Sequence, residues 1–248
     1  MKKKIAVVLV SAMMAMSLCA CGKEEAATTE AATEMTTEVT TEETTTEEAT
    51  EATNDDATSD DASGDSIQAE RGTIDENNVY TNSTLGLSFT IDDNCTIYSD
   101  EQIMQLLGMG QDVLQDEVGL SAEQLEKAMN GTFYDVWFAY PDGVSNIYVA
   151  YENQSMTGTL LYDESTYASS MKSQFEAVTS LGYTFDADTT ETYAGQEYTC
   201  LNAHTTQGID QKVLLRKYKN YMICITISFP AGTTEIPERF LNSFTAVE

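Results

Sequence analysis

Basic residues are scarce in this chain. Lysine and arginine number 12 against 41 aspartates and glutamates, which gives the 248 residues a formal net charge of −29. A surface of this charge repels DNA, RNA and anionic lipid headgroups, so nucleic-acid binding and peripheral membrane binding are both strongly disfavoured. The single histidine, His204, argues against metal sites built from several imidazoles and limits any catalytic triad to this one residue.

Cysteine is also sparse and unevenly placed. Cys19 and Cys21 stand near the N-terminus, which leaves Cys95, Cys200 and Cys224 for the rest of the chain. Three thiols allow at most one disulfide, so the core must come from packing. A simple meander would put Cys200 and Cys224 about 9–10 Å apart, too far for a disulfide. A disulfide from Cys95 to either of them stays open.

No apolar run reaches the roughly 20 residues that cross a bilayer as a helix. The uncharged stretch Ile5–Leu18 has fourteen residues and follows the basic Lys2–Lys4. This layout is typical of a secretory signal peptide, and an uncleaved N-terminal helix is the alternative.

A processing site follows this stretch directly. The sequence Leu18-Cys19-Ala20-Cys21 resembles the lipobox of bacterial lipoproteins. The resemblance implies that residues 1–20 are a signal peptide removed before Cys21, and that the Cys21 thiol is diacylated. Two acyl chains anchor a protein stably where one does not. We therefore expect a chain that is lipid-anchored through Cys21 at the extracytoplasmic face of the cell membrane.

Residues 21–71 contain almost nothing that can form a core. After Cys21 they are nearly all Thr, Glu, Ala, Asp and Ser, with sixteen acids against Lys23 and Arg71 and no aromatic residue. Such a segment cannot bury enough apolar surface to offset its ordering entropy, so the sequence predicts a disordered acidic linker. A flexible coil of this length has an end-to-end distance of about 40 Å, and like charges extend it.

Residues 72–248 carry the patterns of a single folded domain. Short segments rich in β-branched and aromatic residues are separated by Gly, Asn or Pro-Asp-Gly. In one of them Trp137 and Phe138 point to opposite faces and both are apolar, so its hairpin is expected to lie centrally between two covering layers. The predicted strands are 79–81, 87–91, 132–140, 146–151, 183–193, 196–205, 210–219 and 221–229.

Helices are indicated by caps and by apolar spacing. Ser99 with Gln102, and Ser121 with Gln124, form two capping boxes of the same kind. One continuous apolar stripe consists of Tyr167, Met171, Phe175, Val178 and Leu181. The predicted helices are 100–107, a weaker one at 111–117, 122–129, 164–181 and a short terminal helix from Ile236.

Together these elements define an α+β fold, an antiparallel β-sheet covered by helices on both faces. The opening YTNSTLGLSFTI from Tyr80 to Ile91, the long helix, the meander and the closing Arg239–Phe244 resemble small Firmicutes lipoproteins with a PsbP-like α/β/α sandwich. The resemblance implies non-catalytic roles in the assembly and support of membrane complexes, and it supplies no catalytic residue. The helical insert at 99–129 is longer than the resemblance implies.

The cysteines and the histidine do not suggest a nucleophilic site. Cys200 and His204 share a strand face but lie about 13 Å apart, too far for a thiol–imidazole hydrogen bond. A dyad of His204 with Cys95 or Cys224 stays open, although a buried or edge thiol is the ordinary interpretation.

The acidic residues allow two weak interpretations. Asp92-Asp93-Asn94 lacks the spacing of a calcium loop and is better explained as a turn. Asp186 and Asp188 share a strand face and could form a carboxylate pair, but a solvent-facing edge strand explains them better. The thirteen tyrosines could line a binding face, and sheet packing accounts for most of them.

The sequence thus predicts a lipoprotein whose folded domain binds or supports another component without being an enzyme. No catalytic, metal or cofactor-binding residue is assigned. The expected partners are the membrane, through diacylated Cys21, and an extracytoplasmic protein or wall component. A ligand-binding receptor of an uptake system and a wall-acting hydrolase with paired carboxylates are the alternatives.

Overall fold

The computed structural model describes residues 70–247. The lipobox Leu18–Cys21 and the linker up to residue 69 lie outside the described residues. The signal peptide, the lipidation of Cys21, the disordered linker and the segment boundaries at residues 21 and 72 therefore stay predictions. Within residues 70–247, no helix is long and apolar enough to cross a membrane.

An eight-stranded sheet forms the middle layer, and every pairing in it is antiparallel. In sheet order the strands are β4 (Thr96–Ile97), β5 (Thr132–Ala139), β6 (Asn146–Asn153), β11 (Tyr221–Pro230), β10 (Ile209–Tyr218), β9 (Gln196–His204) and β7 (Thr184–Phe185), with β8 (Thr189–Tyr193) beside β9. The β5–β6 hairpin joins the β9–β10–β11 meander through the pairing of β6 with β11. Strands β7 and β8 pair with successive stretches of the same edge of β9.

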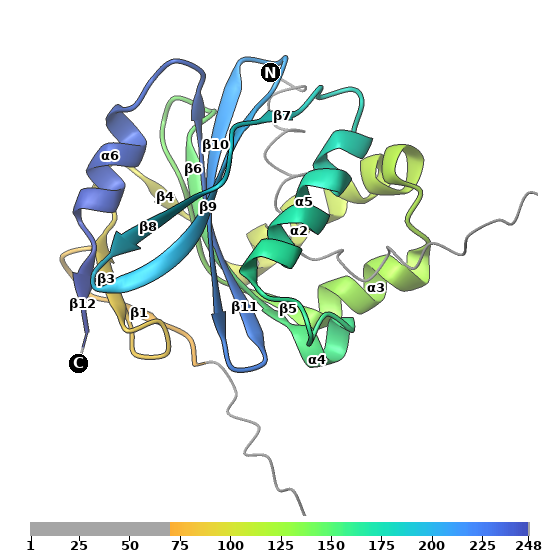
Figure 1. The fold of residues 1–248 in the computed structure, drawn as a ribbon. Helices are drawn as coiled ribbons and strands as arrows, with labels where there is room; N and C mark the ends of the chain where they lie inside the picture. Colours follow the sequence, from red (N-terminus) through yellow and green to blue (C-terminus); the bar gives the residue numbers. More distant parts are fainter. Residues whose placement is uncertain (1–69, 248) are drawn as a thin grey trace, which may run out of the picture. The chain divides into compact units, whose positions relative to one another are not determined.

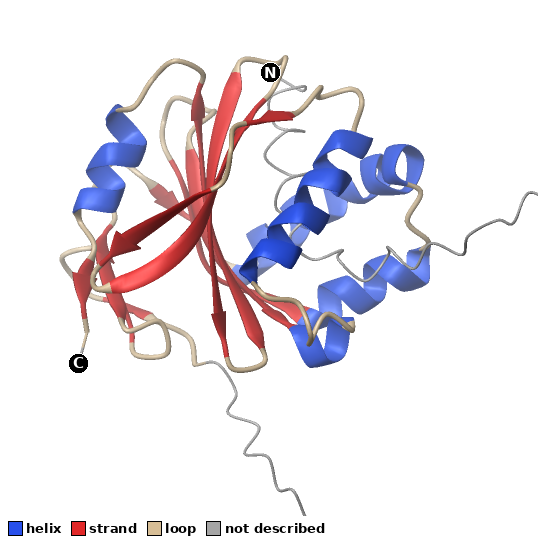
Figure 2. Ribbon diagram, viewed as in Figure 1, coloured by secondary structure: helices blue, strands red, loops and turns tan. Residues whose placement is uncertain are grey.

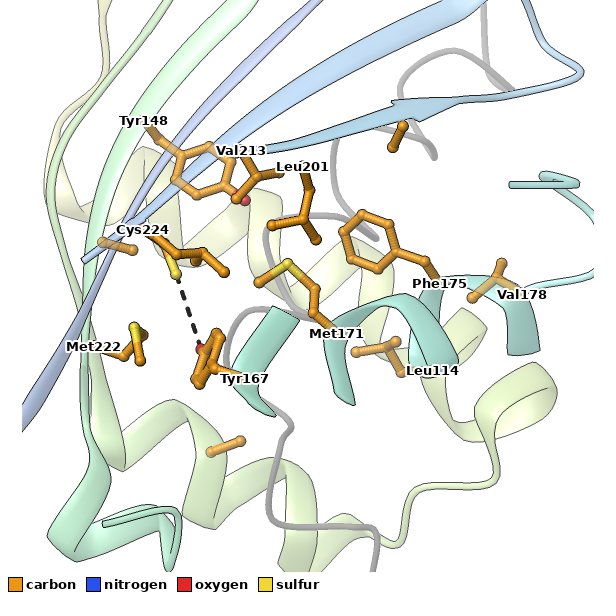
Figure 3. Packing of buried hydrophobic residues seen from close by; sticks show 14 of the residues in the cluster. Leu114, Tyr148, Tyr167, Met171, Phe175, Val178, Leu201, Val213, Met222 and Cys224 are labelled. Atoms are coloured by element: carbon orange, nitrogen blue, oxygen red, sulfur yellow. Dashed lines mark hydrogen bonds between the residues drawn. The ribbon is translucent and has the colours of Figure 1, made fainter. Parts of the chain in front are cut away.

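Helices cover one face of this sheet, as Figures 1 and 2 show. They enclose the first hydrophobic core, part of which Figure 3 shows from close by, with Met171 and Phe175 of the long helix pointing at the sheet. These elements are α2 (Asp100–Val113), the π-helix η2 (Leu114–Val118), α3 (Ala122–Gly131), α4 (Gln154–Thr157) and α5 (Glu164–Ala177).

The other face is covered by a terminal helix and a second, four-stranded sheet. Phe89 and Phe240 pack there against Phe138, and Phe244 packs against both of them, in a second core that includes β11 side chains. The covering elements are β1 (Thr73–Ile74), β2 (Val79–Asn82), β3 (Leu87–Thr90), α6 (Glu235–Asn242) and β12 (Thr245–Ala246). The predicted antiparallel sheet with helices on both faces is confirmed, and the small sheet is an addition to it.

Alternation along the strands assigned the two cores correctly. Trp137 belongs to the helix-side core and Phe138 to the opposite one, as predicted, and Val136 lies in the same core as Phe138. Ile223, Ile225 and Ile227 likewise share the face toward α6. Because side chains alternate with a period of two, this assignment follows once the register is fixed.

Both capping boxes are present. The Ser99 hydroxyl accepts from the Gln102 N–H while the Gln102 side chain accepts from the Ser99 N–H, and Ser121 with Gln124 repeats the arrangement. The helix after Ser99 is longer than predicted because Gly108 and Gly110 do not break it. Burial of residues such as Ile103 and Leu107 outweighs the glycine cost of about 1 kcal/mol each.

Two other predicted elements need correction. The long helix ends at Ala177, before 181, because the backbone of Val178 leaves the helical region at φ −82°, ψ 79°. Val178 and Leu181 are nevertheless buried in the predicted stripe. The predicted strand 183–193 is interrupted at residues 186–188. Between the pairs Phe185–Ala203 and Thr189–Cys200, these three residues stand opposite only two residues of β9, so the extra residue breaks the regular ladder.

Candidate binding pocket

A largely apolar pocket of about 290 Å³ lies between α2 and the β5–β6 hairpin, and we call it the α2 pocket. Its walls come from α2, from β5 and the residue after β4, and from the hairpin turn. The lining residues are Tyr98, Leu106, Met109, Trp137, Ala139, Tyr140, Gly143, Val144, Ser145 and Asn146. Pockets dominated by apolar and aromatic side chains with few polar groups are the usual form of a ligand site.

The hairpin turn that forms one wall is held rigid by Asp142. Its carboxylate accepts from the N–H groups of Val144 and Ser145 at 2.9 and 2.7 Å, and from the Ser145 hydroxyl at 2.5 Å. The Tyr140 N–H donates to the Ser145 carbonyl across the turn at 2.8 Å. Gly143 has φ +70°, a left-handed conformation that favours glycine. The Pro-Asp-Gly turn therefore fixes this wall of the pocket.

Polar groups in the floor of the pocket already have partners. The Trp137 indole N–H donates to the Asn146 side-chain oxygen at 3.3 Å, and the Asn146 amide donates to the Val144 carbonyl at 3.1 Å. Tyr98 lies edge-on to Trp137 with ring centroids 6.2 Å apart. Burial raises the pKa of Tyr98, and burial together with the Asp92 charge raises the pKa of Tyr140. Both phenols stay protonated at neutral pH.

The α2 wall differs from the hairpin wall in character. Met109 on the rim of the pocket is 59% exposed, and Met104 nearby on the helix is 54% exposed. Methionine side chains adapt to the shape of what they contact. A Cβ added at Gly108 would meet nothing within 4 Å, so packing does not require glycine there. The helix wall is thus the adjustable side of the pocket.

His204 lies in a different part of the structure, at the far end of β9. Its Nδ1 is 2.9 Å from Asp210 and its Nε2 is 3.2 Å from Asp186. These two hydrogen bonds raise the pKa of His204, the bond to Asp210 more strongly. Because carboxylates engage both ring nitrogens, this arrangement leaves neither nitrogen to activate a nucleophile.

The predicted carboxylate pair is not formed. Asp186 contacts His204, whereas Asp188 forms an ion pair with Lys172 at 2.5 Å. The two carboxylates thus have separate partners, and they lie between β7 and β8 rather than on the edge strand that was predicted. Asp92 is in the predicted turn, in which its carbonyl accepts from the Cys95 N–H at 2.9 Å, and its side chain pairs with Arg239 at 2.7 Å.

Cys95, Cys200 and Cys224 are all free thiols. Cys200 packs in the core beneath α6 and Cys224 in the core beneath the helices, so they face opposite sides of the sheet. Burial raises the pKa of Cys95 to about 11 and that of Cys200 to about 12, and it raises the pKa of Cys224 as well. Thiols that stay protonated at neutral pH are poor nucleophiles.

Glu152 was missed by the sequence patterns, since the predicted strand stopped at Tyr151. This carboxylate is 1% exposed and accepts from the hydroxyls of Thr157, Thr159 and Tyr167, the last two at 2.9 and 2.6 Å. Burial raises its pKa, and the hydroxyls partly oppose the shift. Tyr167 also lies 3.9 Å from the Cys224 sulfur, the dashed contact in Figure 3. Glu152 could have been identified in the sequence as an acidic residue directly after an apolar strand.

Asp135 is the second group that the sequence patterns missed. It lies at the bulge in β5 and accepts from the Tyr80 hydroxyl, from the Asn82 amide at 2.7 Å and from the Gly72 N–H at 3.0 Å. Arg71 pairs with Asp100 and also donates to the Tyr134 carbonyl at 3.3 Å. The chain therefore joins the domain at the beginning of β5.

Comparison with known proteins gives similarity at the level of fold. No family model matches the chain, and no curated protein matches it. Among solved structures, it is similar to cyanobacterial PsbP from Synechocystis sp. PCC 6803, at 12% identity over 68% of this chain and 91% of that chain, with a TM-score of 0.42. A Bacteroides thetaiotaomicron protein is 9% identical over 73% of this chain and 50% of that chain, with a TM-score of 0.33.

Proposed function

We propose that this protein is a lipoprotein, anchored through diacylated Cys21 at the extracytoplasmic face of the cell membrane, whose domain binds another component without catalysis. The acidic linker tethers the domain to the lipid anchor. The partner is an extracytoplasmic protein or a wall component, and it inserts an apolar group into the α2 pocket.

The composition of the α2 pocket supports this proposal. Apart from two protonated phenols, its lining residues carry no titratable side chain, and Ser145 and Asn146 are engaged within the turn. About 290 Å³ lies at the lower end of the range for small-molecule sites. A space of this size fits one aromatic or branched aliphatic side chain of a partner.

Photo-crosslinking on intact cells tests the binding proposal. A benzophenone amino acid at Met109, on the exposed rim, should give a specific crosslinked product. The additional change Val144→Glu introduces a charge into the pocket and should abolish that product. The matched control carries the benzophenone at exposed Thr233, in the loop before α6. Identical products at both positions, or products unaffected by Val144→Glu, would refute binding through the pocket.

The anchor is tested separately. Cys21→Ala should release the protein from the membrane or leave it unprocessed, whereas Cys95→Ala should leave its fractionation unchanged. Full membrane retention of Cys21→Ala would contradict lipid anchoring.

The size of the pocket also supports a second candidate, capture of a small apolar or aromatic solute for uptake. A thermal-shift screen of small apolar and aromatic solutes, carried out on the full chain and on its Val144→Glu variant, distinguishes the two proposals. A solute that raises the midpoint of the parent chain but not of Val144→Glu favours the receptor. A screen without any such response favours a macromolecular partner.

A further inference from the structure

An exposed apolar projection stands at one end of the sheet. Leu161 is 94% exposed, Leu160 47% and Met156 49%, all in α4 or the loop that joins it to α5. We call these three side chains the leucine tip. Isolated exposed apolar residues are ordinary, whereas three within six positions of one short helix and its loop make this segment a candidate for an interaction site.

The loop that carries the tip is firmly held. The Gly158 and Thr159 N–H groups both donate to the Gln154 carbonyl at 3.0 Å, and the Thr159 hydroxyl reaches buried Glu152. The Lys217 ammonium donates to the carbonyls of Leu160 and Tyr162 at 2.8 Å each. A backbone fixed in this way presents the leucines at a constant position outside the core.

Three lysines lie at the same end of the domain as the leucine tip. Lys217 binds its backbone, and the Lys127 ammonium lies 3.9 Å from where a Cβ on Gly158 would stand. Lys219 belongs to the β10–β11 turn, whose Asn220 carbonyl accepts from the Gln154 N–H at the start of α4. Three of the seven basic residues of 72–248 therefore gather at this end of an otherwise strongly acidic domain.

Nearby acids are partly engaged within the fold. The Glu164 carboxylate accepts from the Lys217 N–H at 2.7 Å, and Asp163 caps α5 through the Thr166 N–H at 2.8 Å. Both carboxylates keep their charge, but with the three lysines the five groups carry a net charge of +1, whereas residues 72–248 as a whole carry −18.

The chain joins the domain at the same end of the sheet. Arg71 donates to the carbonyl of Tyr134 near the start of β5, and Thr132 pairs with Glu152 near the end of β6. Figure 1 shows the first described residues, α4 and the β10–β11 turn all at its lower side. Cys21 is separated from this end by residues 22–69 alone.

We propose that the leucine tip docks on the membrane that carries the anchor, with Leu160, Leu161 and Met156 entering the interface and Lys127 and Lys219 contacting anionic headgroups. This inference rests on lipid anchoring as proposed above. Weak docking suffices for a tethered domain, because the tether makes the contact intramolecular and keeps the effective concentration high. The α2 pocket lies at the opposite end of β5 and would stay available.

Brominated lipids, which quench tryptophan emission on contact, test the docking. The lipidated full chain with Leu161→Trp is reconstituted into vesicles of phosphatidylglycerol and brominated phosphatidylcholine. The matched control is Ala231→Trp, exposed at the other end of β11. The emission of Trp137, which is 1% exposed, is subtracted using the parent chain. The Leu161→Trp emission should fall while the Ala231→Trp emission is unchanged.

Other outcomes separate the two proposals. If the chain sediments with vesicles but the Leu161→Trp emission is not quenched, lipid anchoring is supported and docking is refuted. Docking is also refuted if the Leu161→Trp and Ala231→Trp emissions are quenched equally. If the chain does not sediment, anchoring fails and docking fails with it. In a second measurement, adding Lys127→Glu and Lys219→Glu should reduce quenching on anionic vesicles and leave it unchanged on neutral ones.

Discussion

The buried carboxyl of Glu152 makes the stability of this domain depend on pH in a predictable direction. The side chain is 1% exposed and is bound by hydroxyl donors rather than by a lysine or arginine. Burial without a counter-charge disfavours the ionised form, which is why its pKa lies above the ordinary value of 4.5. Glu152→Gln keeps the shape and removes the titration, while the rotatable hydroxyls can accept from the new amide.

The sign follows from linkage. A carboxyl whose pKa is raised in the folded state stabilises the fold by its full amount when the pH is below its unfolded-state pKa. This stabilisation is lost as the pH rises through the folded-state pKa. One proton is involved, so the slope reaches at most about 1.4 kcal/mol per pH unit. Glu152→Gln should therefore gain stability relative to the parent chain as the pH rises above about 4.5. Glu152→Ala should lose roughly 2–4 kcal/mol, because it leaves a cavity and buried hydroxyls without their acceptor.

The assay is urea denaturation of both chains between pH 5 and 9, followed by Trp137 fluorescence. The difference between the two free energies of unfolding isolates Glu152, since all other titrating groups are shared. Parallel curves across the whole range would show that the Glu152 pKa is not raised in the folded protein. As a control, Glu197→Gln changes an exposed glutamate and should follow the parent curve.

Three further predictions concern other parts of the fold. An NMR titration of the single imidazole should show a His204 pKa above 6.5, and Asp210→Asn should lower it. The ion pairs of His204 stabilise the fold below the unfolded-state pKa of this residue, and this stabilisation is lost as the pH rises through its raised folded-state pKa. A His204 pKa that is not raised would contradict the ion pairs. Gly108→Ala should stabilise the domain by about 0.5–1 kcal/mol in urea denaturation, and a loss of stability would show that glycine is needed there for packing. Ser99→Ala should cost about 1 kcal/mol by removing the cap of α2, and an unchanged midpoint would contradict the capping box.

Much of the fold could be predicted because its determinants are local. A capping box lies within four residues, so Ser99 and Ser121 marked the starts of α2 and α3 correctly. Strand alternation assigned Trp137 and Phe138 to different cores for the same reason. Element ends were less reliable, since the end of α5 at Ala177 and the interruption at 186–188 depend on contacts with distant elements.

The candidate site could not be predicted because it depends on contacts distant in sequence. The α2 pocket combines Leu106 and Met109 with Trp137 and the hairpin turn, and no spacing rule joins a helix to a later hairpin. Asp135 holds Gly72, which lies 63 residues earlier in the chain. Arg216 donates to the Leu85 carbonyl across 131 residues. Such pairs become visible when the sheet order is known.

The Glu152 hydrogen bonds hold the same loop that carries the leucine tip. Thr157 and Thr159, which bind the buried carboxylate, lie between Met156 and Leu160 of the tip, so the loop is held to β6 from inside the core. Lys217 fastens the same loop from outside through the Leu160 and Tyr162 carbonyls. A buried carboxyl that costs stability when it ionises is hard to explain by packing alone, since an apolar residue of similar size is often neutral or better at such positions. Its cost is understandable if the loop must hold exposed leucines in place. Glu152→Gln should then preserve docking, whereas Glu152→Ala should weaken the quenching at Leu161→Trp even under conditions in which the domain stays folded.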